Sequence, residues 1–195
     1  QPEYLNSFYI NRLYHEFEIS KKINDSKITK IYELVDTQGT PILVVEDFGG
    51  IPLSNLIRGN SIDLELFFDI SIKLAEILQV LEDNNIIHKD INPKNILIKI
   101  DTGEIKLTDF GISVQKKNFG DEEPSYGHFE GTIHYISPEQ TGRMNVQIDH
   151  RTDYYSLGVT LYEMLTGELP FKSDDIMELV YFHLAQRPIE PHKIN

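Results

Sequence analysis

The stretch His88-Lys89-Asp90-Ile91-Asn92-Pro93-Lys94-Asn95 places a carboxylate, two amides and two lysines directly after the apolar pair Ile86-Ile87. Asn and Pro favour turns, so the sequence predicts a short strand followed by a loop. Asp90 can accept a proton, and the amide oxygen of Asn95 can bind a metal ion. An Asp followed five residues later by Asn is common, however, and both could be ordinary loop or capping residues.

A second motif, Asp109-Phe110-Gly111, follows a predicted β-hairpin made of Ile96–Ile100 and Glu104–Thr108. Alone it could be a plain turn after a strand. Together the two motifs suit phosphoryl transfer, which needs alignment and charge neutralisation more than covalent chemistry. Mg²⁺ prefers oxygen ligands, and Asn95 and Asp109 offer two. Asp90 would then orient an acceptor hydroxyl and take its proton.

Helices and strands alternate unevenly along the rest of the chain. Helices are predicted at 7–23, Leu53–Arg58, 63–84, 153–166 and 174–186, and strands at Lys27–Val35 and Pro41–Phe48. The continuous apolar run within the second strand, Ile42 to Val45, is typical of a strand covered on both faces. The pattern indicates an α+β fold, with the strands early and the helices late.

The longest predicted helix, 63–84, has Asp63 as its N-cap. Its buried face is predicted to hold Leu64, Phe67, Phe68, Leu74, Ala75, Leu78 and Leu81. Asp153 is most simply an N-cap of the helix that follows it, and His88 is expected to be a packed core histidine.

Composition excludes several classes of protein. The 195 residues carry a formal net charge of −13, which argues against nucleic-acid binding. Cysteine is absent, which excludes a disulfide scaffold and fits a reducing, cytoplasmic setting. No apolar run is long enough for a membrane span. The chain starts at Gln1 without a leader, so we expect a piece of a longer protein.

Further motifs carry a family resemblance. His88–Asn95 and Asp109–Gly111 resemble the catalytic loop and metal-binding motif of protein kinases. The segments Ile136–Asn145 and Arg151–Glu163 are similar to the N-terminal Ser/Thr-kinase-like domain of bacterial multi-sensor hybrid proteins. The resemblance implies a protein-kinase-like bilobal α+β fold truncated at both ends, with a small-lobe remnant at 1–48 and most of the large lobe at 49–195. It also implies attached sensor or ATPase domains.

The resemblance assigns roles residue by residue. It implies that Asp90 is the base, and that Asn95 and Asp109 bind the Mg²⁺ of bound ATP. Glu16 would pair with an ATP-binding lysine, with Glu18 as the weaker candidate for that role. Val45 would lie at the back pocket, the backbone of Glu46 and Phe48 would face adenine, and Leu97 would lie beneath the ring. Residues 109–139 would form the activation segment, with Ser125 and Tyr126 as exposed hydroxyls and Thr132 near Asp90. Asp153 would be a support residue that holds the backbone of the catalytic loop.

Three departures from the family pattern bear on activity. No G-x-G-x-x-G loop or ATP-binding lysine strand is found, so this chain alone is expected to be nearly inactive. Asn92 stands where Ser/Thr kinases usually have Lys, and Lys94 is a candidate to contact the γ-phosphate instead; it could equally be a solvated lysine. Lys89 replaces the usual Arg, which weakens docking of a phosphorylated activation loop because Lys lacks a planar two-point grip.

The sequence therefore predicts Mg²⁺-dependent transfer of the ATP γ-phosphoryl group to a protein Ser or Thr. Two alternatives remain open. One is a non-catalytic kinase-like module that binds nucleotide or a partner, which the Asn92 substitution favours. The other is a small-molecule phosphotransferase, which Gly131-Thr132 and the long activation segment disfavour.

Overall fold

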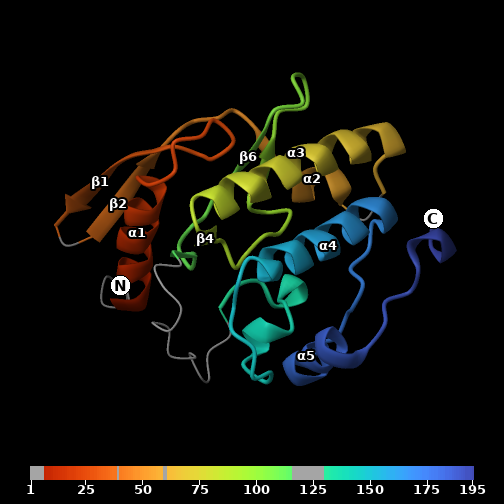
Figure 1. The fold of residues 1–195 in the computed structure, drawn as a ribbon. Helices are drawn as coiled ribbons and strands as arrows, with labels where there is room; N and C mark the ends of the chain where they lie inside the picture. The colour runs from red at the N-terminus through yellow and green to blue at the C-terminus, as the bar shows by residue number, and fades with distance from the viewer. Residues whose placement is uncertain (1–6, 39, 59–60, 116–129) are drawn as a thin grey trace.

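The computed structural model describes residues 7–38, 40–58, 61–115 and 130–195. In these residues, helices and short strands alternate in the order α1, β1–β3, α2, α3, β4–β7, α4, α5, with three short 3₁₀ turns in the described part after β7 (Figure 1). The expected α+β class is confirmed. No helix in the described part of the chain has the length and apolarity that a membrane crossing requires.

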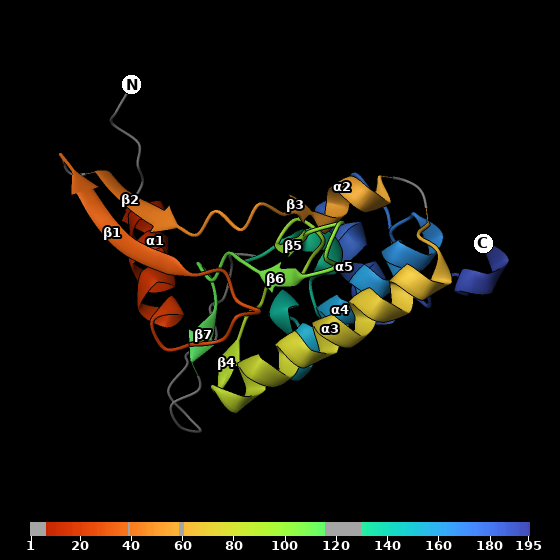
Figure 2. The ribbon, with the colours of Figure 1, turned by 90° about the horizontal axis from the view of Figure 1, so that it is seen from above.

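The N-terminal part is a helix beside a β-hairpin. Strands β1 (Ile31–Thr37) and β2 (Thr40–Val45) pair antiparallel, and α1 (Ser7–Ser20) packs against them. Figure 2 shows this unit to one side of the helical part, joined to it by an extended segment after β2. Ile42 and Val45 are each 49% exposed, so the prediction that this strand is covered on both faces is wrong for the described residues. α1 covers one face only.

A small sheet adjoins the loops that contain the two sequence motifs. Strands β3 (Ile51–Pro52), β5 (Ile96–Ile98) and β6 (Ile105–Leu107) form it in the order β3-β5-β6, and all pairs are antiparallel. The predicted hairpin across residues 101–103 is therefore confirmed. A second pair joins β4 (Ile86–Ile87) to β7 (Val114–Gln115). This pair fixes the two ends of the segment that holds the sequence motifs.

Helices enclose the core below these strands. They are α2 (Leu53–Ile57), α3 (Leu64–Asp83), α4 (Arg151–Thr166) and α5 (Ile176–Ala185). The core joins α3 to the β5–β6 hairpin: Leu74, Leu81, Ile96 and Leu107 are each at most 2% exposed and belong to one cluster. The helix predictions are confirmed within a few residues at each end.

Helix α3 begins as predicted but buries a different face. The Asp63 carboxylate accepts hydrogen bonds from the backbone N–H groups of Glu65 and Leu66, so it is the N-cap. Leu64 and Phe68 are 63% and 59% exposed, and Ala75 is also exposed, so their predicted burial is wrong. Ile70 and Ile77 take part in the core instead, because the true buried stripe follows Phe67, Ile70, Leu74, Ile77, Leu78 and Leu81.

Helix α5 packs on α4 through a buried aromatic cluster. The Tyr155 hydroxyl and His183 Nδ1 lie 2.9 Å apart, and the His183 ring meets Phe171 edge-on with centroids 5.1 Å apart. Burial, together with the nearby His134, lowers the pKa of His183 to about 4. The imidazole is therefore neutral in the folded protein over the whole physiological range.

This histidine predicts acid sensitivity. Below about pH 6.5 the unfolded chain binds a proton at His183, whereas the folded protein does not until about pH 4, so acidification stabilises the unfolded state. We expect wild type to lose about 2 kcal/mol more free energy of unfolding than His183→Gln between pH 7.5 and pH 5. Urea unfolding at both pH values measures the difference, and equal losses in the two proteins would contradict it.

Candidate active site

The register of the β5–β6 hairpin brings the two motifs together. Ile96 pairs with Leu107, and the Thr108 N–H donates to the Asn95 carbonyl at 3.0 Å. Asn95 directly precedes β5, and Asp109 follows two residues after β6. Neighbouring strands lie about 4.8 Å apart. The hairpin therefore places Asn95 beside Asp109, although 14 positions separate them in the sequence.

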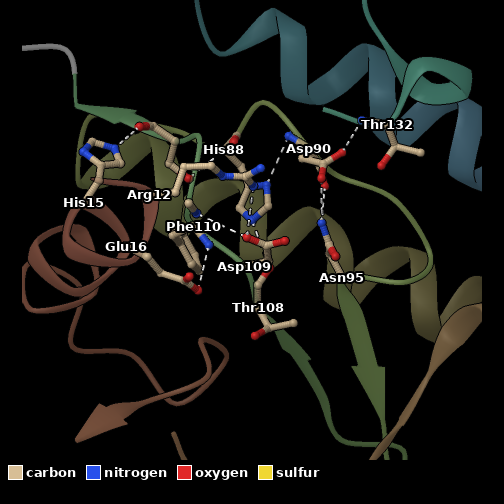
Figure 3. Close-up of polar contacts among 12 residues, drawn as sticks. Arg12, His15, Glu16, His88, Asp90, Asn95, Thr108, Asp109, Phe110 and Thr132 are labelled. Atoms are coloured by element: carbon tan, nitrogen blue, oxygen red, sulfur yellow. Dashed lines mark hydrogen bonds and ion pairs between the residues drawn. The ribbon is translucent and has the colours of Figure 1, made fainter. Parts of the chain in front are cut away.

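The Asp90 carboxylate is the centre of a hydrogen-bond network (Figure 3). Its Oδ1 accepts from the Thr132 backbone N–H at 2.8 Å and from Asn92 Nδ2 at 3.0 Å. Its Oδ2 accepts from Asn95 Nδ2 at 3.1 Å. The predicted proximity of Thr132 and Asp90 is confirmed. Such contacts hold a carboxylate in one orientation, as a general base requires.

Asn92 has a larger part in this network than the sequence indicated. Its side chain is 1% exposed, and Nδ2 also lies 3.2 Å from Thr132 Oγ1. Its Oδ1 accepts from the Lys94 backbone N–H at 2.9 Å. Asn92 thus bridges Asp90 and Thr132 and fixes the loop, but a neutral amide carries no charge toward an anionic ligand.

Helix α1 fastens the turn at Asp109. Asp109 has φ 65°, a conformation that Asp adopts more readily than most residues, and its Oδ1 accepts from Gly111 N at 3.3 Å. Arg12 Nη2 lies 3.7 Å from Asp109 Oδ1, and Glu16 Oε1 accepts from Phe110 N at 3.2 Å. Burial, and then the Asp109 charge, raise the pKa of Glu16. Arg12 and Glu16 lie four residues apart, on one helix face.

His88 connects the two motifs from inside the core. It is fully buried, Nε2 lies 3.2 Å from the Thr108 carbonyl, and Nδ1 accepts from Asp90 N at 3.2 Å. The ring meets Phe110 edge-on, with centroids 4.8 Å apart. The expectation of a packed core histidine is confirmed.

Asp153 holds the loop from below. Its two carboxylate oxygens accept from the backbone N–H groups of His88 and Lys89, each at 2.8 Å, and the residue is 2% exposed. Helix α4 begins at Arg151, so Asp153 is not its N-cap. The support role that the kinase resemblance implies, in which Asp153 holds the backbone of the catalytic loop, is confirmed. Burial raises the pKa of the Asp153 carboxyl, and His88 and the two N–H groups act in the opposite direction.

The donor set fits Mg²⁺ bound together with a nucleotide. Asn95 gives Nδ2 to Asp90, which leaves Oδ1 without a hydrogen bond among the described residues, and the Asp109 side chain is 42% exposed. Those residues contain no cluster of three or more His, Cys, Asp or Glu suited to a metal. Mg²⁺ usually takes one or two carboxylates and completes its shell with phosphate and water oxygens. One carboxylate and one amide meet that requirement.

The structure places the other predicted site residues on β2, after it, and on or just before β5. Leu97 is half-buried on β5, and Val45 is 49% exposed at the end of β2. Glu46 pairs with Lys106 at 2.6 Å, and the buried Phe48 ring lies 4.6 Å from Lys99 Nζ. Lys94 is exposed, with no side-chain hydrogen bond or ion pair in the described part of the chain. Ser125 and Tyr126 lie outside the described residues.

Residues 4–193 match the family model described as protein kinase domain. This chain is a member of the protein kinase family. A relative in Clostridium acetobutylicum, named as a probable serine/threonine-protein kinase, is 31% identical over 96% of this chain and 28% of its own length. Serine/threonine-protein kinase PknB of Mycobacterium tuberculosis is also 31% identical, over 95% of this chain and 30% of its own length. The chain thus spans less than a third of these relatives.

The observed architecture agrees with membership of the protein kinase family. The hairpin with α1 and the helical part with the two motifs fit the bilobal kinase fold. Arg12 and Glu130 were not singled out from the sequence as parts of this kinase site, although they contact it. Asn92 was singled out only as a departure from the family pattern, and its hydrogen bond to Asp90 was not foreseen. For Arg12 the available signal is its spacing from Glu16, and for Glu130 it is the adjacent Gly131-Thr132.

The Asp153 contact predicts a large stability effect. Asp153→Ala leaves two backbone N–H groups in the loop without their acceptor, which should cost about 2–4 kcal/mol of the free energy of unfolding. Asp175→Ala is the matched control, because Asp175 accepts from two N–H groups at the exposed start of α5 and an exposed cap is worth about 1 kcal/mol. Urea unfolding compares the two variants. Equal losses of the free energy of unfolding would contradict the prediction that the buried Asp153 contact stabilises the protein more than an exposed cap does.

Proposed function

We propose that the protein transfers the γ-phosphoryl group of ATP to the hydroxyl of a protein Ser or Thr. One observation carries the proposal: Asp90, Asn95 and Asp109 converge, and the Thr132 amide fixes the Asp90 carboxylate. The relatives' names, serine/threonine-protein kinases, support the same reaction. Phosphoryl transfer asks for this combination of alignment and oxygen ligands.

In the proposed reaction Asp90 receives the proton. Its Oδ1 is occupied by the Thr132 and Asn92 donors, whereas Oδ2 has one donor, Asn95. A carboxylate oxygen accepts more than one hydrogen bond, so Oδ2 retains capacity for the acceptor O–H. The acceptor oxygen forms the new bond to phosphorus, the bond to the ADP oxygen breaks, and the proton passes to Asp90. General base catalysis of this kind contributes about 10²–10⁴ in rate.

Asn95 Oδ1 and the Asp109 carboxylate would hold the Mg²⁺ that accompanies ATP. When bound, Mg²⁺ neutralises the charge that the phosphates carry in the transition state. Arg12, beside Asp109, and Glu16, which accepts from Phe110 N, keep the Asp109 turn against α1. The nucleotide ligand would therefore meet a preformed turn rather than order it on binding.

The adenine would lie against the segment between β2 and β3. The Glu46 N–H donates to the Lys30 carbonyl at 2.8 Å, so its own carbonyl is the group available for a ligand. The Phe48 backbone offers a second position, and Leu97 on β5 supplies an apolar surface below. Val45 would border the back of the pocket. Glu16 would pair with the ATP-binding lysine that the family pattern requires.

The proposal extends to the parent protein. The relatives are more than three times as long as the part that matches, which supports further domains in a signalling protein. The sensor and ATPase domains implied by the hybrid-protein resemblance stay predictions, as do the lobe boundaries at 1–48 and 49–195 and a cytoplasmic location. A protein Ser/Thr substrate and ATP are the proposed partners.

Removal of the metal-binding carboxylate tests the proposal directly. Asp109→Asn in the natural full-length protein should lower Mg²⁺-ATP turnover by at least about 10²-fold, on the scale of one lost charge-stabilising contact. Labelled ATP with a generic protein substrate measures the rate. The control is Asp174→Asn, an exposed aspartate before α5, which should match wild type. Turnover of Asp109→Asn within a few-fold of wild type would remove Asp109 from the metal site.

A second prediction follows from Asn92, which lacks the positive charge of the lysine that Ser/Thr kinases usually have there. We propose that the exposed Lys94 contacts the γ-phosphate in its place, so Lys94→Ala should lower kcat by about 10²-fold and Lys94→Arg by much less. The double variant Asn92→Lys/Lys94→Ala should regain most of the activity. If Lys94→Ala turns over like wild type, Lys94 is a solvated lysine; Lys172→Ala controls for loss of a surface charge.

A further inference from the structure

The segment that begins at Glu130 is attached to the catalytic loop at consecutive positions. Lys89 Nζ lies 2.6 Å from Glu130 Oε2. The next residue of the loop, Asp90, accepts a hydrogen bond at Oδ1 from the N–H of Thr132, two residues after Glu130, at 2.8 Å. Gly131 lies between them with φ +98°, and a Cβ there would come within 3.0 Å of the Lys89 carbonyl. Any side chain at 131 would therefore be strained, both by φ and by the nearby Lys89 carbonyl, and the ion pair lies directly beside the hydrogen bond that orients the base.

Burial distinguishes this ion pair from most others in the protein. The Lys89 side chain is 10% exposed and that of Glu130 30%, whereas Lys172 and Glu168 are 57% and 55% exposed. Exposed pairs contribute little because water screens them and both side chains lose freedom. A pair that is largely shielded from water interacts more strongly and leaves a costly unpaired charge when one partner is removed.

The backbone of Lys89 is itself held in place, so the ion pair can fix the position of Glu130 relative to the catalytic loop. The Lys89 N–H donates to Asp153 at 2.8 Å, its carbonyl accepts from Gln140 Nε2 at 2.8 Å, and its φ is 70°. With the backbone held on both sides, Nζ is an anchored cation at the edge of the hollow between α1 and the loop. Glu130 is the carboxylate that meets it there.

We propose that Glu130 is a positioning residue: through Lys89 it holds Gly131-Thr132 against Asp90, so that this part of the activation segment needs no phosphate to be aligned. The inference rests on the proposed phosphoryl transfer. The family resemblance implies weak docking of a phosphorylated hydroxyl at residue 89, since Lys replaces Arg. A carboxylate encoded in the chain supplies a permanent anion for the same cation.

A double-mutant cycle tests the pair in the natural full-length protein. We expect Glu130→Gln and Lys89→Met each to lower kcat by about 10- to 100-fold, the scale of a misplaced reacting group. The KM for ATP should change little, because Glu130 contacts none of the proposed nucleotide residues. The double variant should be no worse than either single variant. Additive losses would overturn the coupling, and Glu168→Gln, from an exposed pair, should match wild type.

Two further measurements separate this inference from the proposed function. Hydrogen exchange of the Thr132 amide should be faster in Glu130→Gln than in wild type, even if neither protein transfers phosphate; unchanged exchange would overturn the positioning role. Wild type treated with a protein phosphatase should keep its kcat within a few-fold. A fall to the level of Glu130→Gln would show that a phosphate, and not Glu130, aligns the segment.

Discussion

The buried carboxylate of Asp153 is the interaction on which the candidate site depends. It accepts two backbone hydrogen bonds at the point where the chain leaves β4, and Lys89 adopts its left-handed conformation there. A non-glycine residue in that conformation is strained and persists only where its surroundings determine it. The neighbouring residue is Asp90. The direction of the proposed base is therefore set by a contact from a helix more than sixty residues away in the sequence.

Hydrogen bonds to backbone groups assemble most of the rest, and one ion pair from α1 adds to them. The β5–β6 register brings Asn95 to Thr108, and His88 spans from the Thr108 carbonyl to the Asp90 N–H. Helix α1 contributes Arg12 and Glu16 to the next turn. The His88 ring is fully buried, and its nitrogens would otherwise lack partners, which is costly, so the site and the fold stabilise each other.

The sequence predicted those parts of the site that depend on residue type and short spacing. The hairpin, the Asp63 cap and the core position of His88 are confirmed. It failed where a residue's role depends on a distant neighbour. The local pattern assigned Asp153 to a helix cap, and only the family resemblance implied that its carboxylate holds the loop. Leu64 and Phe68 have apolar side chains at helical spacing but face outward. Periodicity predicts which residues share a helix face, but not which face the rest of the fold covers.

Taken alone, the sequence determined the α+β class, the two motifs and the chemistry that their side chains can perform, because these follow from local propensity and functional groups. The tertiary structure decided which atom of each side chain makes a contact, and with which partner. Asn95 presents Nδ2 to Asp90, Asn92 joins Asp90 to Thr132, and Glu130 meets Lys89. These pairings require approach within about 3 Å of groups far apart in the chain. Only the packed backbone sets such distances, and no spacing in the sequence encodes them.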